Sequence, residues 1–179
     1  ILSKLLGDDF DMMPDSGPFN ASVKLKDEAI DYFADLSKDL LSRVESLNKT
    51  LDTEELLSVL KGLESYDKYK DRLDAGDGVD ITSIFKSQVF PDKAEIINSN
   101  KILYSLIQAV KDLERNKFGY WGKADWQEIK PKTINDKIYL VLKNAGQPLH
   151  FTDIAAKINE VRFDHKNANP ATVHNELIL

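Results

Sequence analysis

Apolar residues recur every three or four positions from Lys26 to Leu47, a spacing that places them on one face of an α-helix. They are Ile30, Phe33, Leu36, Leu40, Val44 and Leu47. Asp52 and Glu55 then form the pattern of a capping box, which starts a second helix. Its apolar face is formed by Leu56, Leu60, Leu63 and Tyr66. We expect two antiparallel helices joined near residues 48–51. A dimeric coiled coil is the alternative, but the spacing does not last four heptads.

A further helical pattern follows Pro91, where Asp92 and Glu95 are spaced as another capping box. Its apolar face is formed by Leu103, Leu106, Ile107, Val110 and Leu113. We therefore expect residues 23–120 to form a helical bundle. Residues 1–22 are acidic and interrupted by proline and glycine, which indicates a linker or the end of a missing upstream domain. An acidic docking segment for a basic partner is the alternative.

Three short helices are predicted over residues 133–179, after a connecting segment at residues 121–132. Thr133 is the expected cap of the first, and Gly146 its left-handed end. Thr152 or Asp153 is the expected cap of the second. Asn169 as N-cap and Pro170 at the first helical position begin the third. The residues expected to point inward are Ile134, Ile138, Val141, Leu142, Ile154, Ala155, Ile158, Val173 and Leu177.

Composition narrows the function classes. The chain has no cysteine, which excludes disulfides and thiolate metal sites. It has no run of eighteen apolar residues and no signal-peptide pattern, so we expect a cytoplasmic protein without a membrane span. The segment from Asp74 to Ile81 lacks the oxygen ligands of an EF-hand loop, because its third and fifth positions are Gly76 and Gly78. Since no nucleophile elbow, P-loop, HExxH or kinase signature occurs, we expect no enzyme, no cofactor and no metal.

Charge is divided unevenly along the chain. Residues 1–120 hold 16 Lys and Arg against 23 Asp and Glu, whereas residues 121–179 hold 8 against 7. The acidic part and the nearly neutral part therefore present different surfaces, and we expect them to have different roles.

The predicted third helix exposes residue types that suit a nucleic-acid groove. Thr172, His174 and Asn175 are expected on its outer face as DNA-binding residues, because such side chains hydrogen-bond to base edges and sugars. Lys157, Arg162 and Lys166 are expected to neutralise phosphates. Three helices with a polar outer face also occur in folds that never bind DNA, so the pattern alone leaves this function open.

The last third of the chain resembles a known family. The segments KNAGQPLHFTDIAAKIN and NPATVHNELIL, with KFGYWGKADWQEIKPK before them, resemble the HARE-type helix-turn-helix domain. This is a winged-helix module of the RNA polymerase delta subunit, also found after a sigma-70 region 4 motif in bacterial sigma-factor-like proteins. The helical patterns predict an all-α fold in which a helical bundle precedes a three-helix module. The resemblance, which covers only the last third of the chain, implies that this module is a winged-helix, helix-turn-helix unit lacking its β-wing.

That resemblance implies a transcription-associated, sigma-factor-like regulator that binds duplex DNA, associates with RNA polymerase and belongs to the bacterial nucleoid. Two features of the family are not in this sequence: the β-wing that would follow residue 179, and the region 4 motif, which we expect upstream of Ile1. The alternative function is a protein-interaction module that docks on RNA polymerase or another partner without contacting DNA, which the acidic first 120 residues favour. Nothing in the sequence specifies the oligomeric state.

Overall fold

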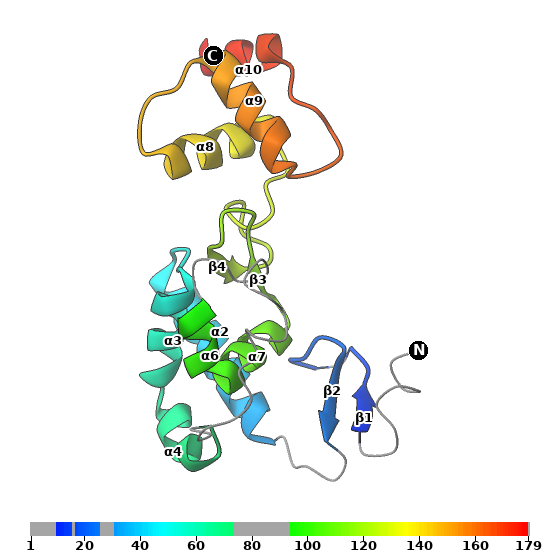
Figure 1. Cartoon of the computed structure of the whole chain (residues 1–179), viewed down its shortest axis with the longest axis vertical. Coiled ribbons are helices and arrows are strands. Elements are labelled where there is room, and N and C mark those ends of the chain that lie inside the picture. Colours follow the sequence, from blue (N-terminus) through cyan, green and yellow to red (C-terminus); the bar gives the residue numbers. More distant parts are fainter. Residues whose placement is uncertain (1–9, 16, 26–30, 74–93, 179) are drawn as a thin grey trace.

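The computed structural model describes residues 10–15, 17–25, 31–73 and 94–178 (Figure 1). Within these ranges the chain is mostly helical, as expected for an all-α protein. The helices are α2 (Asp31–Leu47), α3 (Thr53–Lys61), α4 (Glu64–Leu73), α6 (Ala94–Ser99), α7 (Lys101–Ala109), α8 (Ile134–Ala145), α9 (Phe151–Val161) and α10 (Pro170–Ile178). The strands are β1 (Phe10–Met13), β2 (Ser22–Leu25), β3 (Leu113–Arg115) and β4 (Trp121–Lys123).

The first hydrophobic core lies among α2, α3, α4, α6, α7 and the β3–β4 hairpin, which together form the upstream bundle. The predicted apolar face of α2 is confirmed, since Leu36, Leu40 and Val44 are fully buried there. The predicted capping box is confirmed as well: the Glu55 backbone N–H donates to the Asp52 carboxylate, and the Asp52 N–H donates to the Glu55 carboxylate. Ile30, Asp92 and the segment from Asp74 to Ile81 lie outside the described residues.

Two predicted helices are shorter than expected. The helix that starts at Asp52 ends at Lys61, and α4 begins at Glu64 after the C-cap residue Gly62, because glycine is a poor residue for a helix interior. The helix expected to continue to Leu113 ends at Ala109 instead. Its last expected apolar residues stay buried in the same core, but Val110 forms a β-bridge with Phe19 and Leu113 begins β3.

Two antiparallel hairpins were not expected from the sequence. Strands β1 and β2 pair within and just after the segment expected to be a linker. Strands β3 and β4 pair from Leu113 opposite Lys123 to Arg115 opposite Trp121. Gly122 permits this hairpin to lie close to the following turn, since a Cβ atom there would come within 2.8 Å of the Trp126 ring. The described part of the chain is therefore mostly helical rather than wholly so.

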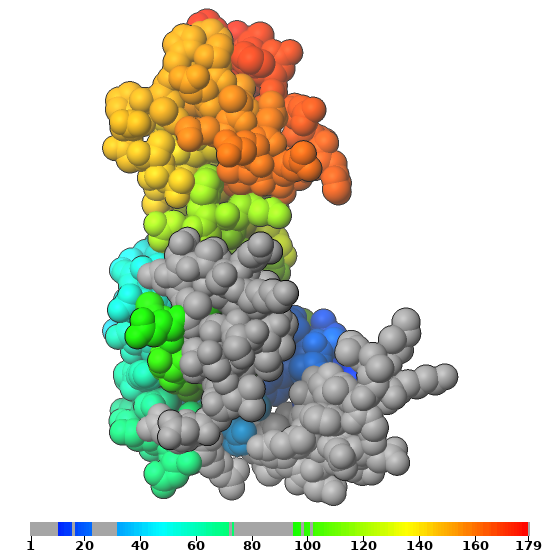
Figure 2. All heavy atoms as spheres, in the orientation of Figure 1, coloured from blue at the N-terminus to red at the C-terminus, as the bar shows by residue number. Residues whose placement is uncertain are grey.

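A second hydrophobic core lies among α8, α9 and α10, the three-helix unit, which stands at one end of the molecule (Figures 1 and 2). Its buried residues are Ile138, Val141, Ile154, Ala155, Ile158, Ala168 and Val173. Thr133 caps α8 and Gly146 ends it with a φ of 64°, as predicted. The inward position expected for Leu177 is wrong: it is 46% exposed, and the buried contact of α10 with the core is made by Val173 one turn earlier.

Candidate nucleic-acid interface

Helix α10 is the element that the sequence singled out for DNA contact, and it lies at the end of the molecule's long axis (Figure 1). Its N-terminus is capped as predicted, because the Ala171 N–H donates to the Asn169 side chain at 2.8 Å. Val173 is fully buried and holds the helix against α9 and α8. Thr172 and Asn175 are both exposed and, three positions apart, share one face of the helix. Two of the predicted contact residues are thus presented together.

His174 lies to the side of this pair. It is exposed, but its ring makes an edge contact with Phe151 at the start of α9, with ring centroids 4.9 Å apart. Phe151 in turn lies beside the His150 ring, at 4.2 Å. On the same helix, Glu176 accepts a hydrogen bond from the Asn135 side chain of α8 at 2.8 Å. His174 therefore contributes to the packing of α10 on α9 as well as to the exposed surface.

The loop between α9 and α10, residues 162–169, is fixed by a side chain that the sequence analysis did not single out. The Asn159 carboxamide accepts from the Ala168 N–H at 2.6 Å and donates to the Ala168 carbonyl at 3.0 Å. These two bonds close the loop just before the first turn of α10. The position of α10 relative to α9 therefore depends on a polar residue within α9 as well as on apolar packing.

A buried lysine holds the other end of this loop. Lys137 of α8 is only 6% exposed, and its ammonium lies 2.7 Å from the Asp164 carboxylate. The hydrogen bonds from Lys137 and from the Lys166 backbone hold the pKa of Asp164 below its usual value. Because an unpaired buried ammonium is costly, this pair ties the loop to α8. Arg162 ends α9 with a φ of 53°, and both Arg162 and Lys166 have exposed side chains.

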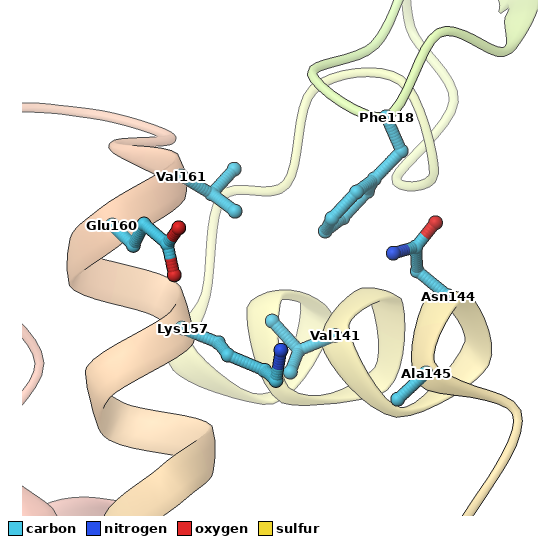
Figure 3. Close-up of a pocket in the computed structure, with 7 residues that line it drawn as sticks. All are labelled: Phe118, Val141, Asn144, Ala145, Lys157, Glu160 and Val161. Atoms are coloured by element: carbon cyan, nitrogen blue, oxygen red, sulfur yellow. The ribbon is translucent and has the colours of Figure 1, made fainter.

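Lys157 lies elsewhere on the unit. It lines a pocket of about 330 Å³ between α8, α9 and the turn of the β3–β4 hairpin (Figure 3). The other residues of the pocket are Phe118, Val141, Asn144, Ala145, Glu160 and Val161. No α10 residue lines it, so the structure does not bring Lys157 together with Thr172 and Asn175. Of the six predicted residues, the outward pair on α10 is the part of the site that geometry groups most clearly.

The start of α9 differs from the prediction that Thr152 or Asp153 is its cap. His150 is the N-cap, and its ring nitrogen Nδ1 lies 2.8 Å from the Thr152 hydroxyl and 3.5 Å from the Thr152 backbone nitrogen. The helix consequently begins at Phe151, two to three residues earlier than expected. Histidine is a rare cap residue compared with Ser, Thr, Asp and Asn, which is why the sequence favoured its neighbours.

The charges of the three-helix unit are balanced. Residues 133–179 contain five Lys and Arg and five Asp and Glu. Lys137 is paired with Asp164, and Lys143 is paired with Glu128. In the described ranges Lys157, Arg162 and Lys166 have no carboxylate within ion-pair distance, so these three cations are the ones available to an external phosphate.

Comparisons with known proteins add no assignment: no protein-family model, no curated protein and no solved structure matches this chain. In the ranges that the structure covers, no helix is long and apolar enough to cross a membrane. The same ranges contain no cluster of three or more His, Cys, Asp or Glu side chains arranged to hold a metal ion.

Proposed function

We propose that the three-helix unit binds duplex DNA, with α10 as the helix that enters the major groove. The observation that carries this proposal is that Thr172 and Asn175 are both exposed on the outer face of α10, while Val173 on its inner face is buried and holds the helix in place. A short helix offers base-reading side chains to a groove only if its other side is firmly held. An Asn side chain can form bidentate hydrogen bonds with adenine, and a Thr side chain can contact the DNA backbone or the thymine methyl group.

Arg162 and Lys166 supply the phosphate contacts in this proposal. Both are exposed, and both belong to the residues that precede α10. The capped N-terminus of α10 adds a partial positive charge at the same end of the helix. Because only a few cations are available, we expect moderate affinity and a shallow dependence on salt.

The finer assignment, a sigma-factor-like transcription regulator that associates with RNA polymerase in the nucleoid, rests on the resemblance of residues 117–179 to HARE-type domains. Residues 1–120 are the part of the chain that would contact a basic protein surface, since they carry an excess of seven negative charges over positive ones.

A protein-interaction module is the second candidate. It is favoured by the charge balance of residues 133–179 and by two exposed apolar residues at the end of α10, Leu177 and Ile178, which are 46% and 68% exposed. In this case α10 would dock on a protein groove without contacting DNA.

Binding of the chain to a labelled mixed-sequence duplex, followed by fluorescence anisotropy across a salt series, separates the two candidates. DNA binding predicts saturable binding at low salt, with an affinity that falls linearly on a logarithmic plot as salt increases. A complete lack of duplex binding at low salt, together with salt-resistant binding to purified RNA polymerase, would reject the DNA-binding proposal in favour of the interaction module.

A further inference from the structure

The connection between the upstream bundle and the three-helix unit is short. Ile129 is 5% exposed and lies against the hairpin at Gly122, whereas Thr133 already caps α8. Only residues 130–132 separate these two anchored positions, and Pro131 has a fixed φ angle. So short a connector restricts the orientations of the two units, but it does not select one of them.

Glu128, just before this connector, is hydrogen-bonded to both units. Its carboxylate accepts bonds from Thr50 of the bundle at 3.0 Å, from Lys143 of α8 at 2.7 Å and from the Tyr139 hydroxyl of α8 at 3.3 Å. Partial burial raises the pKa of Glu128, but the hydrogen bonds from Lys143 and Thr50 outweigh this effect and leave the pKa below its ordinary value. The ionised carboxylate is thus the form that links α8 to the bundle.

Phe118, at the tip of the β3–β4 hairpin, makes a second and apolar contact. It packs against the core of the three-helix unit, and its ring lies edge-on to Phe163 of the α9–α10 loop at 5.7 Å. Figure 3 shows its side chain extending from the hairpin toward the groove between α8 and α9. The bundle therefore reaches the three-helix unit from a side other than the one that Glu128 contacts.

Asn116 connects these two contacts. Asn116 is 9% exposed. Its side-chain oxygen accepts hydrogen bonds from the backbone N–H groups of Phe118 and Tyr120, and its side-chain nitrogen donates one to the Glu128 carbonyl at 2.9 Å. The same residue thereby shapes the hairpin tip that carries Phe118 and holds the backbone that carries Glu128. An ionic contact and an apolar contact fixed to one another resist rotation about the connector better than either does alone.

We propose that Glu128 and Phe118 form a joint that holds the three-helix unit in one orientation on the upstream bundle, so that the chain acts as a rigid adaptor. Glu128 and Phe118 are positioning residues in this inference, since neither belongs to the outward face of α10. The consequence is that the upstream bundle and α10 meet their partners at a fixed relative angle. The inference holds whether α10 binds DNA or protein.

The test is ¹⁵N NMR relaxation on the whole chain without any ligand. The rotational correlation time of residues 134–178 divided by that of the bundle is about 1 for a rigid body. This ratio falls below 1 once the joint is broken, because the smaller unit then tumbles faster. We expect a ratio near 1 for the unmodified chain and for the control Glu45→Ala, which removes the Glu45–Lys123 ion pair inside the bundle. The double variant Glu128→Ala/Phe118→Ala should lower the ratio clearly.

Loss of folding is distinguished from loss of the joint by a second variant. Lys143→Met/Tyr139→Phe removes both α8 donors to Glu128 at exposed positions and leaves the cores intact. This variant too should lower the ratio, by a smaller amount because Phe118 remains. The inference is overturned if the unmodified chain already shows two different correlation times. It is equally overturned if both variants keep a ratio near 1 while the signals of both cores stay in place.

Discussion

The indole N–H of Trp121 donates a hydrogen bond to the hydroxyl oxygen of Thr53, 3.1 Å away, inside the upstream bundle. Trp121 is 4% exposed and Thr53 is 3% exposed, so neither group has water as an alternative partner. The backbone N–H groups of Leu51 and Trp121 donate to each other's carbonyls beside this bond. The β3–β4 hairpin is thereby attached to the start of α3. Trp121 therefore belongs to the hydrophobic core of the upstream bundle.

Replacing Thr53 with Val should destabilise the upstream bundle by about 1–3 kcal/mol, because the buried indole N–H then has no acceptor. Urea unfolding followed by tryptophan fluorescence measures the change. Thr53→Ser is the matched control, since it keeps the hydroxyl and should lose much less. Equal stability of the Val and Ser variants would show that this hydrogen bond contributes little.

Ile138→Ala should destabilise the three-helix unit by about 2–5 kcal/mol, the usual cost of truncating a buried aliphatic side chain. Ile138 is 5% exposed and belongs to the core formed with α9 and α10. Thermal unfolding followed by the NMR signals of this unit measures the loss. Leu177→Ala is the control, because its side chain is 46% exposed and its truncation should change stability by less than about 0.5 kcal/mol. Similar effects of the two variants would contradict the described packing.

The parts of the fold that could be predicted from the sequence are those with local signals. Apolar periodicity indicates the inner faces of α2 and α8. Capping residues indicate the ends of α8, where Thr133 and Gly146 occupy the predicted positions. Strands β3 and β4 could not be predicted in this way, because each has only three residues and an alternating apolar–polar pattern is recognisable only over a longer stretch. Their pairing depends on contacts with Leu51, far away in the sequence.

The candidate site likewise contains residues whose placement follows from local sequence signals and residues whose placement does not. The outward positions of Thr172 and Asn175 result from the period of a single helix, which the sequence contains in full. The roles of Asn159, Lys137 and Glu128 depend on partners in other elements. Polar residues are ordinary in helices, where Lys137 and Asn159 lie, and in connecting segments, where Glu128 lies, so spacing alone does not reveal which of them form buried or bridging contacts.

The start of α8 should show a defined dependence on pH. Burial raises the pKa of Asp136, but hydrogen bonds from the backbone N–H groups of Thr133 and Lys132 outweigh it, so the pKa is lower in the folded protein than in the unfolded chain. A lowered pKa in the folded state contributes stability above the ordinary Asp pKa, and this contribution is lost as the pH falls through the folded value. Asp136→Ala should therefore be less stable than the unmodified chain at pH 7.

The difference between Asp136→Ala and the unmodified chain should shrink as the pH falls below the ordinary Asp pKa of about 4, because the unfolded chain takes up the proton first and the folded carboxylate does so at lower pH. Urea unfolding of both proteins at several pH values gives this difference directly. Asp125→Ala, at an exposed position that caps no helix, is the control and should show no such trend. A difference that stays constant down to the lowest pH at which the chain folds would contradict a role for the ionised Asp136.

Asn175→Ala tests base reading by α10. If Asn175 contacts a base edge, its truncation should weaken binding to a preferred duplex by about 1–3 kcal/mol and reduce the preference for that duplex over others. Selection of duplexes from a random pool, followed by affinity measurements on the best one, provides the assay. Asn144→Ala is the control, because this exposed residue lies on α8 beside the pocket of Phe118. Unchanged affinity and preference in Asn175→Ala would exclude Asn175 as a base contact.

Lys166→Ala tests phosphate binding by the loop before α10. A phosphate contact carries no sequence information, so its loss should weaken all duplexes alike and reduce the slope of log affinity against log salt by about one. Lys61→Ala, at the exposed end of α3, is the matched control and should leave the slope unchanged. Because Asp164 accepts a hydrogen bond from the Lys166 backbone and not from its side chain, the variant keeps the loop closed. A full salt slope in Lys166→Ala would place the phosphate contacts on other cations, with Arg162 as the next residue to test.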